Sequence, residues 1–262
     1  MKKITVLLFF FALLISCKEQ PKTNEIKDVS VEVLEKQYPE NISKIFEAHG
    51  GIDQWNKMKS LEFTMPNDNG DETTLTDLKS RKSLITMPKH TIGFDGKDVW
   101  LQNLDTISYK GNAKFYYNLM FYFYAMPFVL GDDGITYTET EALQFEGKMY
   151  PGIKIAYNAG VGESPDDEYV LYYDSETNKM AWLGYTVTYF SKEKSKKFNY
   201  IRYTDWEQTK GLLLPTNIEW YNYENGKITT KRSSVVFQNN SLSEEETDAS
   251  EFMRPKEANI IE

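Results

Sequence analysis

The sequence predicts a mainly β fold with helices (α+β), in which a strongly curved antiparallel sheet surrounds N-terminal helices and one central aromatic helix. Aromatic residues make up 15% of the 262 residues, a share that favours strands. Several strand-like segments carry apolar side chains on both faces, so something must cover each face of the sheet. Residues 112–126 are apolar nearly all round at helical spacing, which indicates a helix buried on most sides.

Composition limits the class of protein. A chain of this length fits one large domain or two small ones, and we expect a single domain that buries roughly 70–75% of its extended surface without a structural metal. The 39 acidic and 30 basic residues give a net charge of −9 and no basic stripe, so we expect no nucleic-acid partner. A single cysteine excludes a disulfide within the chain.

The N-terminus has the features of a secretory signal. Lys2 and Lys3 precede an apolar run, residues 4–15, that is too short to span a bilayer. The run ends in Leu-Ile-Ser-Cys, which resembles the lipobox of bacterial lipoproteins, and Cys17 is the only cysteine. We therefore expect residues 1–16 to be a signal peptide and Cys17 to be acylated, anchoring an outer-membrane lipoprotein on its periplasmic or cell-surface face.

A polar, aromatic-poor segment follows the cysteine, so residues 17–38 are expected to form a lipidated tether. Residues 39–262 are expected to form a single half-barrel domain. Its first element is a helix that begins at Pro39 and ends at Gly50-Gly51, with Ile42, Ile45 and Phe46 on one face. Apolar residues at three-residue spacing then predict a second short helix: Ile52, Trp55 and Met58.

Strands and turns occupy most of the chain after Lys59. Asp95-Gly96 and Asn225-Gly226 are hairpin signals, because both central residues of such turns require positive φ. Exposed loops are expected at residues 131–134, 160–167 and 192–197.

The helix expected at residues 112–126 ends before Pro127 and lies in the concavity of the curved sheet. Lys114, Asn118 and Tyr122 form its one narrow polar stripe. The other side chains must face the sheet or a ligand, and six are predicted to line a ligand space: Phe115, Tyr116, Leu119, Met120, Phe123 and Tyr124.

No set of residues points to catalysis, a metal or a cofactor. His49 falls at a helix C-terminus, where an imidazolium is favoured by the helix dipole, and His90 is expected to be an ordinary strand residue. Three acidic clusters, at residues 68–72, 132–134 and 166–168, match no EF-hand and are interpreted as solvated turns.

Three segments resemble an uncharacterised family of Bacteroidota lipoproteins over about residues 39–240: residues 45–55, 95–100 and 115–130. More loosely, residues 95–100, 170–179 and 211–219 look like strand motifs of periplasmic lipoprotein carriers and receptors of the LolA/LolB type. That resemblance implies a half-barrel with an apolar cavity that receives acyl chains. It supplies no catalytic residue.

The expected function is therefore that of a membrane-anchored envelope lipoprotein, a monomer without catalysis, that binds an apolar or amphipathic, lipid-like ligand in a curved-sheet cavity. Two alternatives stay open. A cell-envelope scaffold would have a filled core and no ligand, and an enzyme acting on glycan or lipid would need a polar cleft with convergent carboxylates or a histidine. A ligand binder needs an apolar cavity of roughly 300–1,000 Å³.

Overall fold

The computed structural model describes residues 36–158, 166–191 and 193–262. The expected signal peptide, Cys17 and nearly all of the expected tether lie outside these residues. The chain divides into residues 1–37 and a compact unit, Tyr38–Glu262, which contains all of the helices and strands that the structure describes.

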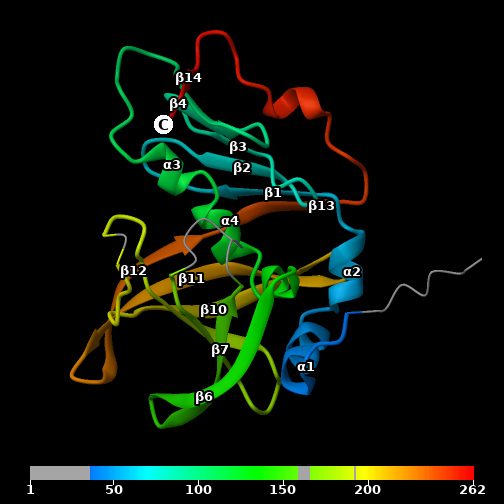
Figure 1. Cartoon of the computed structure of the whole chain (residues 1–262), viewed down its shortest axis with the longest axis vertical. Coiled ribbons are helices and arrows are strands. Elements are labelled where there is room, and N and C mark those ends of the chain that lie inside the picture. Colours follow the sequence, from blue (N-terminus) through cyan, green and yellow to red (C-terminus); the bar gives the residue numbers. More distant parts are fainter. Residues whose placement is uncertain (1–35, 159–165, 192) are drawn as a thin grey trace, which may run out of the picture. The chain divides into compact units, whose positions relative to one another are not determined.

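Two antiparallel sheets of seven strands build the compact unit (Figure 1). The first sheet has the order β13-β1-β2-β3-β4-β5-β14. Its strands are β1 (Ser60–Met65), β2 (Glu72–Asp77), β3 (Ser83–Thr86), β4 (His90–Phe94), β5 (Val99–Asn103), β13 (Gln238–Ser243) and β14 (Asn259–Ile260). The first five strands follow one another along the chain, and the C-terminal part of the chain supplies both edges.

The second sheet is a meander with the order β12-β11-β10-β9-β8-β7-β6. Its strands are β6 (Ile135–Phe145), β7 (Lys148–Tyr157), β8 (Tyr169–Tyr173), β9 (Met180–Tyr185), β10 (Asn199–Thr209), β11 (Leu212–Glu224) and β12 (Lys227–Val236). The predicted class, mainly β with helices and a curved antiparallel sheet, is confirmed, and its strands are divided between two sheets.

Both predicted hairpin turns are present. Residues 95–98, with Gly96 at positive φ, connect β4 to β5, and Asn225 and Gly226, both at positive φ, connect β11 to β12. Local backbone preference was therefore a sufficient guide at these two positions.

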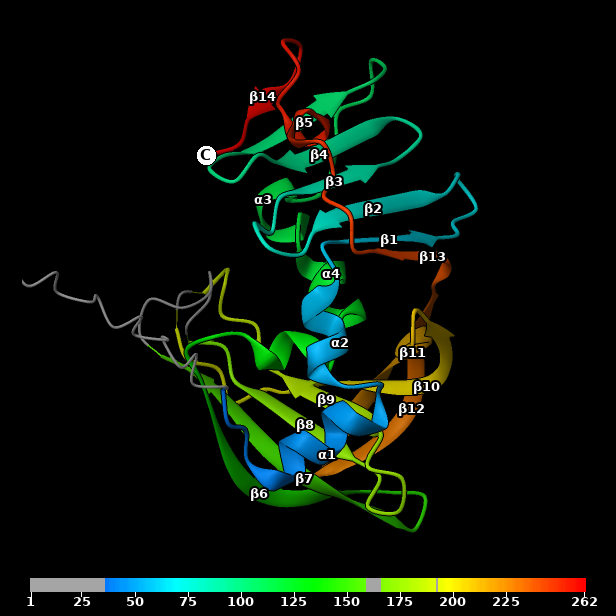
Figure 2. The same ribbon diagram turned by 90° about the vertical axis from the view of Figure 1, so that its right-hand side faces the viewer.

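Two N-terminal helices, α1 (Glu40–Ala48) and α2 (Ile52–Lys57), occur where the apolar spacing predicted them (Figure 2). Gly50, at φ 104°, ends α1, and a Cβ there would lie 2.1 Å from the carbonyl oxygen of Gly211. Only glycine therefore fits this connection, which brings the end of α1 against the β10–β11 turn.

The single helix predicted over residues 112–126 is wrong. Two short helices replace it, α3 (Ala113–Tyr116) and α4 (Leu119–Tyr124), followed by the 3₁₀ turn η1 (Phe128–Gly131). Asn118 interrupts the pattern because its backbone, at φ −128° and ψ −1°, has left the helical region. In both views α4 lies between the two sheets (Figures 1 and 2).

The main core lies between the sheets and around the helices. Its fully buried members include Ile45, Phe63, Tyr124, Phe128 and Leu183. A second buried cluster covers the opposite face of the second sheet and is centred on Trp182, with Phe145, Tyr172 and Tyr200 around it. Both faces of this sheet are therefore apolar, as the two-sided strand pattern predicted.

Candidate ligand cavity

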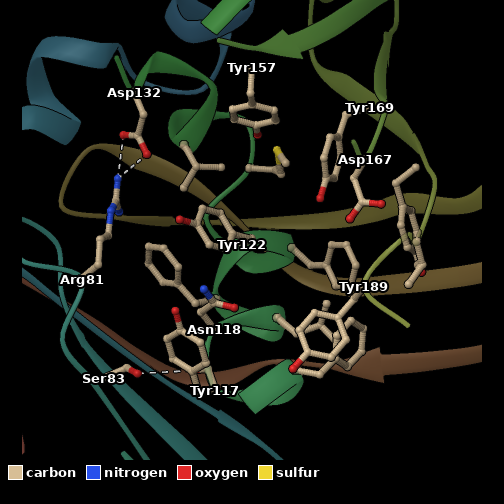
Figure 3. Close-up of a pocket in the computed structure, with 18 of the residues that line it drawn as sticks. Arg81, Ser83, Tyr117, Asn118, Tyr122, Asp132, Tyr157, Asp167, Tyr169 and Tyr189 are labelled. Atoms are coloured by element: carbon tan, nitrogen blue, oxygen red, sulfur yellow. Dashed lines mark hydrogen bonds and ion pairs between the residues drawn. The ribbon is translucent and has the colours of Figure 1, made fainter. Parts of the chain in front are cut away.

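A cavity of about 220 Å³ lies beside α4, between the two sheets (Figure 3). Its walls come from three places: β2, β3 and the turn between them; the segment from α3 to η1; and the ends of β7, β8 and β9. Residues far apart in the sequence therefore meet at one site.

Most of the lining is apolar or aromatic. Leu119, Phe121 and Phe123 project from α4, with Met126 and Val129 beyond them. Tyr157 and Tyr169 meet edge to face at 5.7 Å between ring centroids, and Phe123 lies 5.1 Å from Tyr185. The first pair is edge to face and the second is tilted at 55°, and both contacts favour fixed ring orientations in this wall.

Two hydrogen bonds hold this aromatic wall in place, one from α4 to the second sheet and one within that sheet. The Tyr203 hydroxyl donates to the carbonyl oxygen of Phe123 at 2.8 Å, and the Trp220 indole N–H donates to the Tyr185 hydroxyl at 3.0 Å. Both hydrogen bonds satisfy polar atoms that would otherwise be buried without a partner in an apolar region.

One wall is polar. Thr76, Arg81 and Ser83 come from the β2–β3 hairpin of the first sheet. Ser83 donates to the carbonyl oxygen of Tyr117 at 3.3 Å, and Arg81 Nη2 lies 2.6 Å from both carboxylate oxygens of Asp132 (Figure 3). The guanidinium also lies over the ring of Phe121, 5.2 Å from its centroid. The hairpin, η1 and α4 are thereby joined at this wall.

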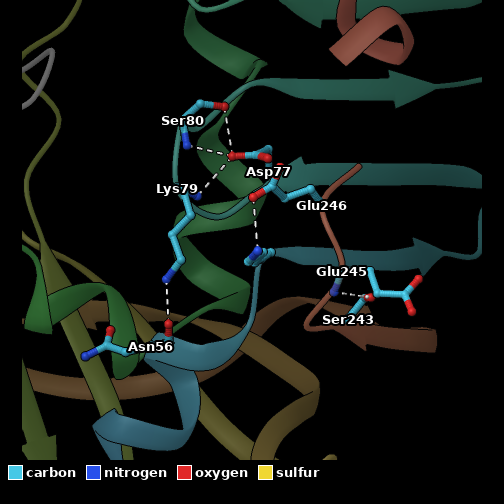
Figure 4. Close-up of polar contacts among 8 residues, drawn as sticks. Asn56, Asp77, Lys79, Ser80, Ser243, Glu245 and Glu246 are labelled. Atoms are coloured by element: carbon cyan, nitrogen blue, oxygen red, sulfur yellow. Dashed lines mark hydrogen bonds and ion pairs between the residues drawn. The ribbon is translucent and has the colours of Figure 1, made fainter. Parts of the chain in front are cut away.

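The hairpin turn that presents Arg81 is held by its own side chains. Asp77 accepts hydrogen bonds from the backbone N–H groups of Lys79 and Ser80, at 3.0 and 2.6 Å, and from the Ser80 hydroxyl (Figure 4). Lys79 reaches across to the carbonyl oxygen of Asn56 at 2.6 Å. Arg81 itself has φ 61°, so the turn carries it in a left-handed conformation.

The charged groups of the lining do not add up to a positive site. Arg81 is paired with Asp132, and the remaining carboxyl is Asp167, which accepts a hydrogen bond from the backbone N–H of Thr188 at 2.6 Å. Burial raises the pKa of Asp167. Burial likewise raises the pKa of the Tyr157 and Tyr169 hydroxyls, which keeps both neutral at physiological pH.

Three aromatic residues cluster at one side of the cavity. Phe115 and Tyr189 belong to the lining, and Phe190 lies 5.0 Å from Phe115 with 65% of its surface exposed. We call Phe115, Tyr189 and Phe190 the aromatic rim. An exposed aromatic group beside an apolar cavity is a place where an apolar molecule can first bind.

Three of the six residues predicted to line a ligand space line this cavity: Phe115, Leu119 and Phe123. The others face elsewhere. Tyr116 donates to Glu72 at 2.8 Å, Met120 is buried in the main core, and Tyr124 packs against Phe63 and Phe237. Whether any of the six contacts a ligand stays a prediction.

Sequence reasoning missed the polar wall and the tyrosines of β7 and β8. Arg81 and Asp132 are 51 positions apart, and no local pattern relates them. Asp132 and Asp167 belong to clusters that were interpreted as solvated turns, whereas both line the cavity and are only partly exposed.

The expectation of an imidazolium at His49 is wrong. His49 ends α1 but is fully buried, and burial lowers its pKa to about 4. Its Nδ1–H donates to the carbonyl oxygen of Ile45 at 2.7 Å. The loss of solvation outweighs the helix dipole, so the ring is neutral. His90 lies in strand β4, as expected.

Among residues 36–158, 166–191 and 193–262, no group of three or more His, Cys, Asp or Glu side chains is placed to hold a metal ion. Within the same ranges, no helix is both long and apolar enough to cross a membrane.

No protein-family profile matches the chain, and a search of curated proteins finds no match. Among solved structures, the chain is similar to a DUF1329 family protein from Desulfovibrio piger, at 12% identity and a TM-score of 0.48, over 81% of this chain and 98% of that one. It is also similar to a LolA superfamily protein from Nitrosomonas europaea, at 9% identity and a TM-score of 0.44, over 78% and 96%.

A third similar structure is an outer membrane lipoprotein-sorting protein domain from Vibrio parahaemolyticus, at 8% identity and a TM-score of 0.37, over 75% of this chain and 92% of that one. All three likenesses are distant. The assignment of an antiparallel architecture therefore rests on the strand order and register of this chain.

Proposed function

We propose that the protein is an envelope lipoprotein, anchored through acylated Cys17, that binds an apolar or amphipathic, lipid-like ligand in the cavity beside α4. It acts as a monomer and without catalysis. The observation that carries the proposal is the cavity itself, because a mainly apolar, aromatic space with a few polar groups is the usual form of a small-molecule site.

The size of the cavity limits the ligand. About 220 Å³ is below the roughly 300–1,000 Å³ of pockets for drug-sized molecules. We therefore propose one acyl segment rather than several chains, with the aromatic rim contacting the part of the ligand that extends outside.

The test is uptake of a neutral fluorescent probe, 1-N-phenylnaphthylamine, by the full-length protein. Leu119→Trp fills the cavity from a half-buried position, so we expect it to abolish the fluorescence gain while melting stays within a few degrees of wild type. Met120→Leu, at the next position but facing the core, is the matched control and should keep uptake.

The same small volume favours one alternative, a scaffold with a filled core. If the wild-type protein takes up no probe, or Leu119→Trp takes up as much as wild type, the binding proposal is wrong. The scaffold then remains.

Anchoring has its own experiment. The lipobox and the single cysteine support acylation of Cys17, so Cys17→Ser should release the protein from membranes. Retention of this variant in the membrane fraction after a salt and carbonate wash would contradict the anchor and leave the cavity proposal intact.

A further inference from the structure

Two residues that line the cavity each carry a buried polar atom with no hydrogen-bond partner among the described residues: Thr76 Oγ1 and Arg81 Nη1. Thr76 is only 1% exposed. Buried donors and acceptors are almost always paired in folded proteins, because leaving one unpaired costs free energy. Thr76 and Arg81 therefore hold unused hydrogen-bonding capacity beside a mainly apolar cavity, which a group of the ligand can use.

The β2–β3 hairpin carries both residues. Thr76 pairs in register with Ser83 at the start of the β2–β3 turn, and the Arg81 backbone N–H donates to the Asp77 carbonyl oxygen at 2.9 Å. The third polar group of this wall, the Ser83 hydroxyl, is already used by Tyr117. The unused hydrogen-bonding capacity is concentrated on Thr76 and Arg81.

Arg81 is also fixed in orientation. Its Nη2 is held by both oxygens of Asp132, and its plane lies over Phe121. Nη1 can only donate, whereas the Thr76 hydroxyl can donate or accept. The atom that satisfies both is a hydrogen-bond acceptor with two lone pairs, such as a carbonyl oxygen.

The charge balance selects among acceptors. Asp132 offsets the charge of Arg81, and Asp167 adds a negative charge when ionised and none when protonated. In neither state does the lining hold surplus positive charge. A free carboxylate gains no net attraction there, and an ammonium group cannot accept from Nη1.

We infer that Thr76 and Arg81 form a head-group subsite that receives an uncharged acyl carbonyl, that of an ester or amide. The inference rests on the proposed function and names its ligand class: a neutral acylated molecule with its carbonyl at the first sheet and its hydrocarbon chain against α4.

The experiment compares ligands of one chain length by displacement of 1-N-phenylnaphthylamine from the full-length protein. Methyl octanoate and N-methyloctanamide present the carbonyl as ester and amide, octanoate presents a charge, octylamine presents a cation, and octane presents no head group. We expect the ester or the amide to bind about tenfold more tightly than octanoate, octylamine and octane, and their order identifies the linkage.

The variants use a matched pair on one strand. Thr76→Val should lower the affinity for the carbonyl ligands about five- to tenfold and leave octane unchanged. Thr74→Val is the control, because Thr74 is also 1% exposed with an unpartnered Oγ1, lies on the same face of β2, and does not line the cavity. It should change no affinity more than twofold.

Arg81→Lys keeps a cation beside Asp132 but supplies one nitrogen in place of the two terminal nitrogens of the guanidinium. It should lower the affinity for the carbonyl ligands as Thr76→Val does. Octanoate binding as tightly as the ester and amide, or equal effects of Thr76→Val and Thr74→Val, would overturn the subsite. If octane binds in either case, the cavity still accepts an apolar ligand. Failure of every ligand to displace the probe would contradict the proposed function itself.

Discussion

The inner faces of the two sheets differ in chemistry. The second sheet presents aliphatic side chains that are fully buried, among them Ile153, Ile155, Leu171, Leu183 and Ile201. The first sheet mixes apolar side chains with three buried hydroxyl residues: Thr74, Thr76 and Ser83. Under the proposed function, the second sheet supplies stability and the first sheet supplies the groups that bind the ligand. The long strands of the second sheet form a continuous apolar support, and the short hairpin of the first sheet carries the hydrogen-bonding groups at the cavity.

The prediction with the largest expected effect tests the packing of apolar side chains on the second sheet. Trp182, fully buried on the outer face of the second sheet, packs against Phe145 and Tyr221 at 4.9 and 5.1 Å between ring centroids. Trp182→Ala should lower the free energy of unfolding by about 3–5 kcal/mol, because it leaves a large cavity. Urea denaturation measures the loss. Met149→Ala, 52% exposed in the same sheet, should change it by less than about 0.5 kcal/mol. A similar small loss for Trp182→Ala would show that this cluster is not tightly packed.

The second prediction concerns pH and the burial of His49 beside this sheet. Its ring lies 4.6 Å from that of Trp206 in β10, and burial, with the charge of Lys179, lowers its pKa from 6.5 to about 4. Between these values the unfolded chain binds the extra proton. The contribution of the neutral ring is therefore present above pH 6.5 and is lost as the pH falls towards 4, by about 3 kcal/mol.

Urea denaturation of wild type and His49→Asn at several pH values between 4 and 7 checks this prediction. The asparagine amide keeps a donor near Nδ1 but does not titrate, so the variant should have a flatter dependence of unfolding free energy on pH. His90→Asn, at a partly exposed histidine, is the control and should follow wild type. Equal slopes for wild type and His49→Asn would contradict the assignment.

The third prediction concerns the outer face of the first sheet. The ring of Trp100 in β5 lies directly over Gly93 in β4, and a Cβ at Gly93 would come within 2.2 Å of it. The indole N–H donates to the carbonyl oxygen of Phe252 at 3.2 Å, so the ring is held in place. Gly93→Ala should therefore cost about 1–3 kcal/mol of unfolding free energy. In a Trp100→Leu background the same change should cost less, and an equal cost in both backgrounds would show that strand conformation rather than the ring is responsible.

The smallest expected effect has the opposite sign. Thr74 Oγ1 is buried without a partner among the described residues, so Thr74→Val removes an unsatisfied polar atom and should raise the unfolding free energy by roughly 1 kcal/mol. Thermal and urea denaturation measure the gain. A loss instead would mean that the hydroxyl is satisfied in solution, and that the polar face of the first sheet costs no stability.

Local signals predicted the secondary structure where one residue type decides the backbone. Asn225-Gly226 and the α1 stop at Gly50 are examples, since positive φ is available chiefly to glycine and asparagine. The helix at residues 112–126 failed because the spacing of Lys114 and Asn118 was interpreted as a polar stripe, whereas Asn118 separates two helices. Apolar periodicity indicates that a segment is buried. It does not indicate that one uninterrupted helix runs through the segment.

Only part of the apolar lining of the candidate cavity could be predicted from the sequence. Phe115, Leu119 and Phe123 follow from one segment that is aromatic all round. Thr76 and Arg81 look like ordinary hairpin residues in the sequence, and their importance arises from Asp132 and Phe121, which the fold brings to them. An unpartnered polar group can be recognised only once its neighbours in the fold are known.

The strand order of the first sheet has a consequence for synthesis. β13 pairs with β1 and β14 with β5, so both edges are closed by segments that leave the ribosome after the entire second sheet. Until residues 238–260 are made, β1 and β5 offer unpaired backbone to any neighbouring chain. The second sheet, a meander of sequential hairpins, has no such delay. A nascent chain is therefore most vulnerable to aggregation through its earliest strands, and a chaperone that binds residues 60–65 or 99–103 would protect it during that interval.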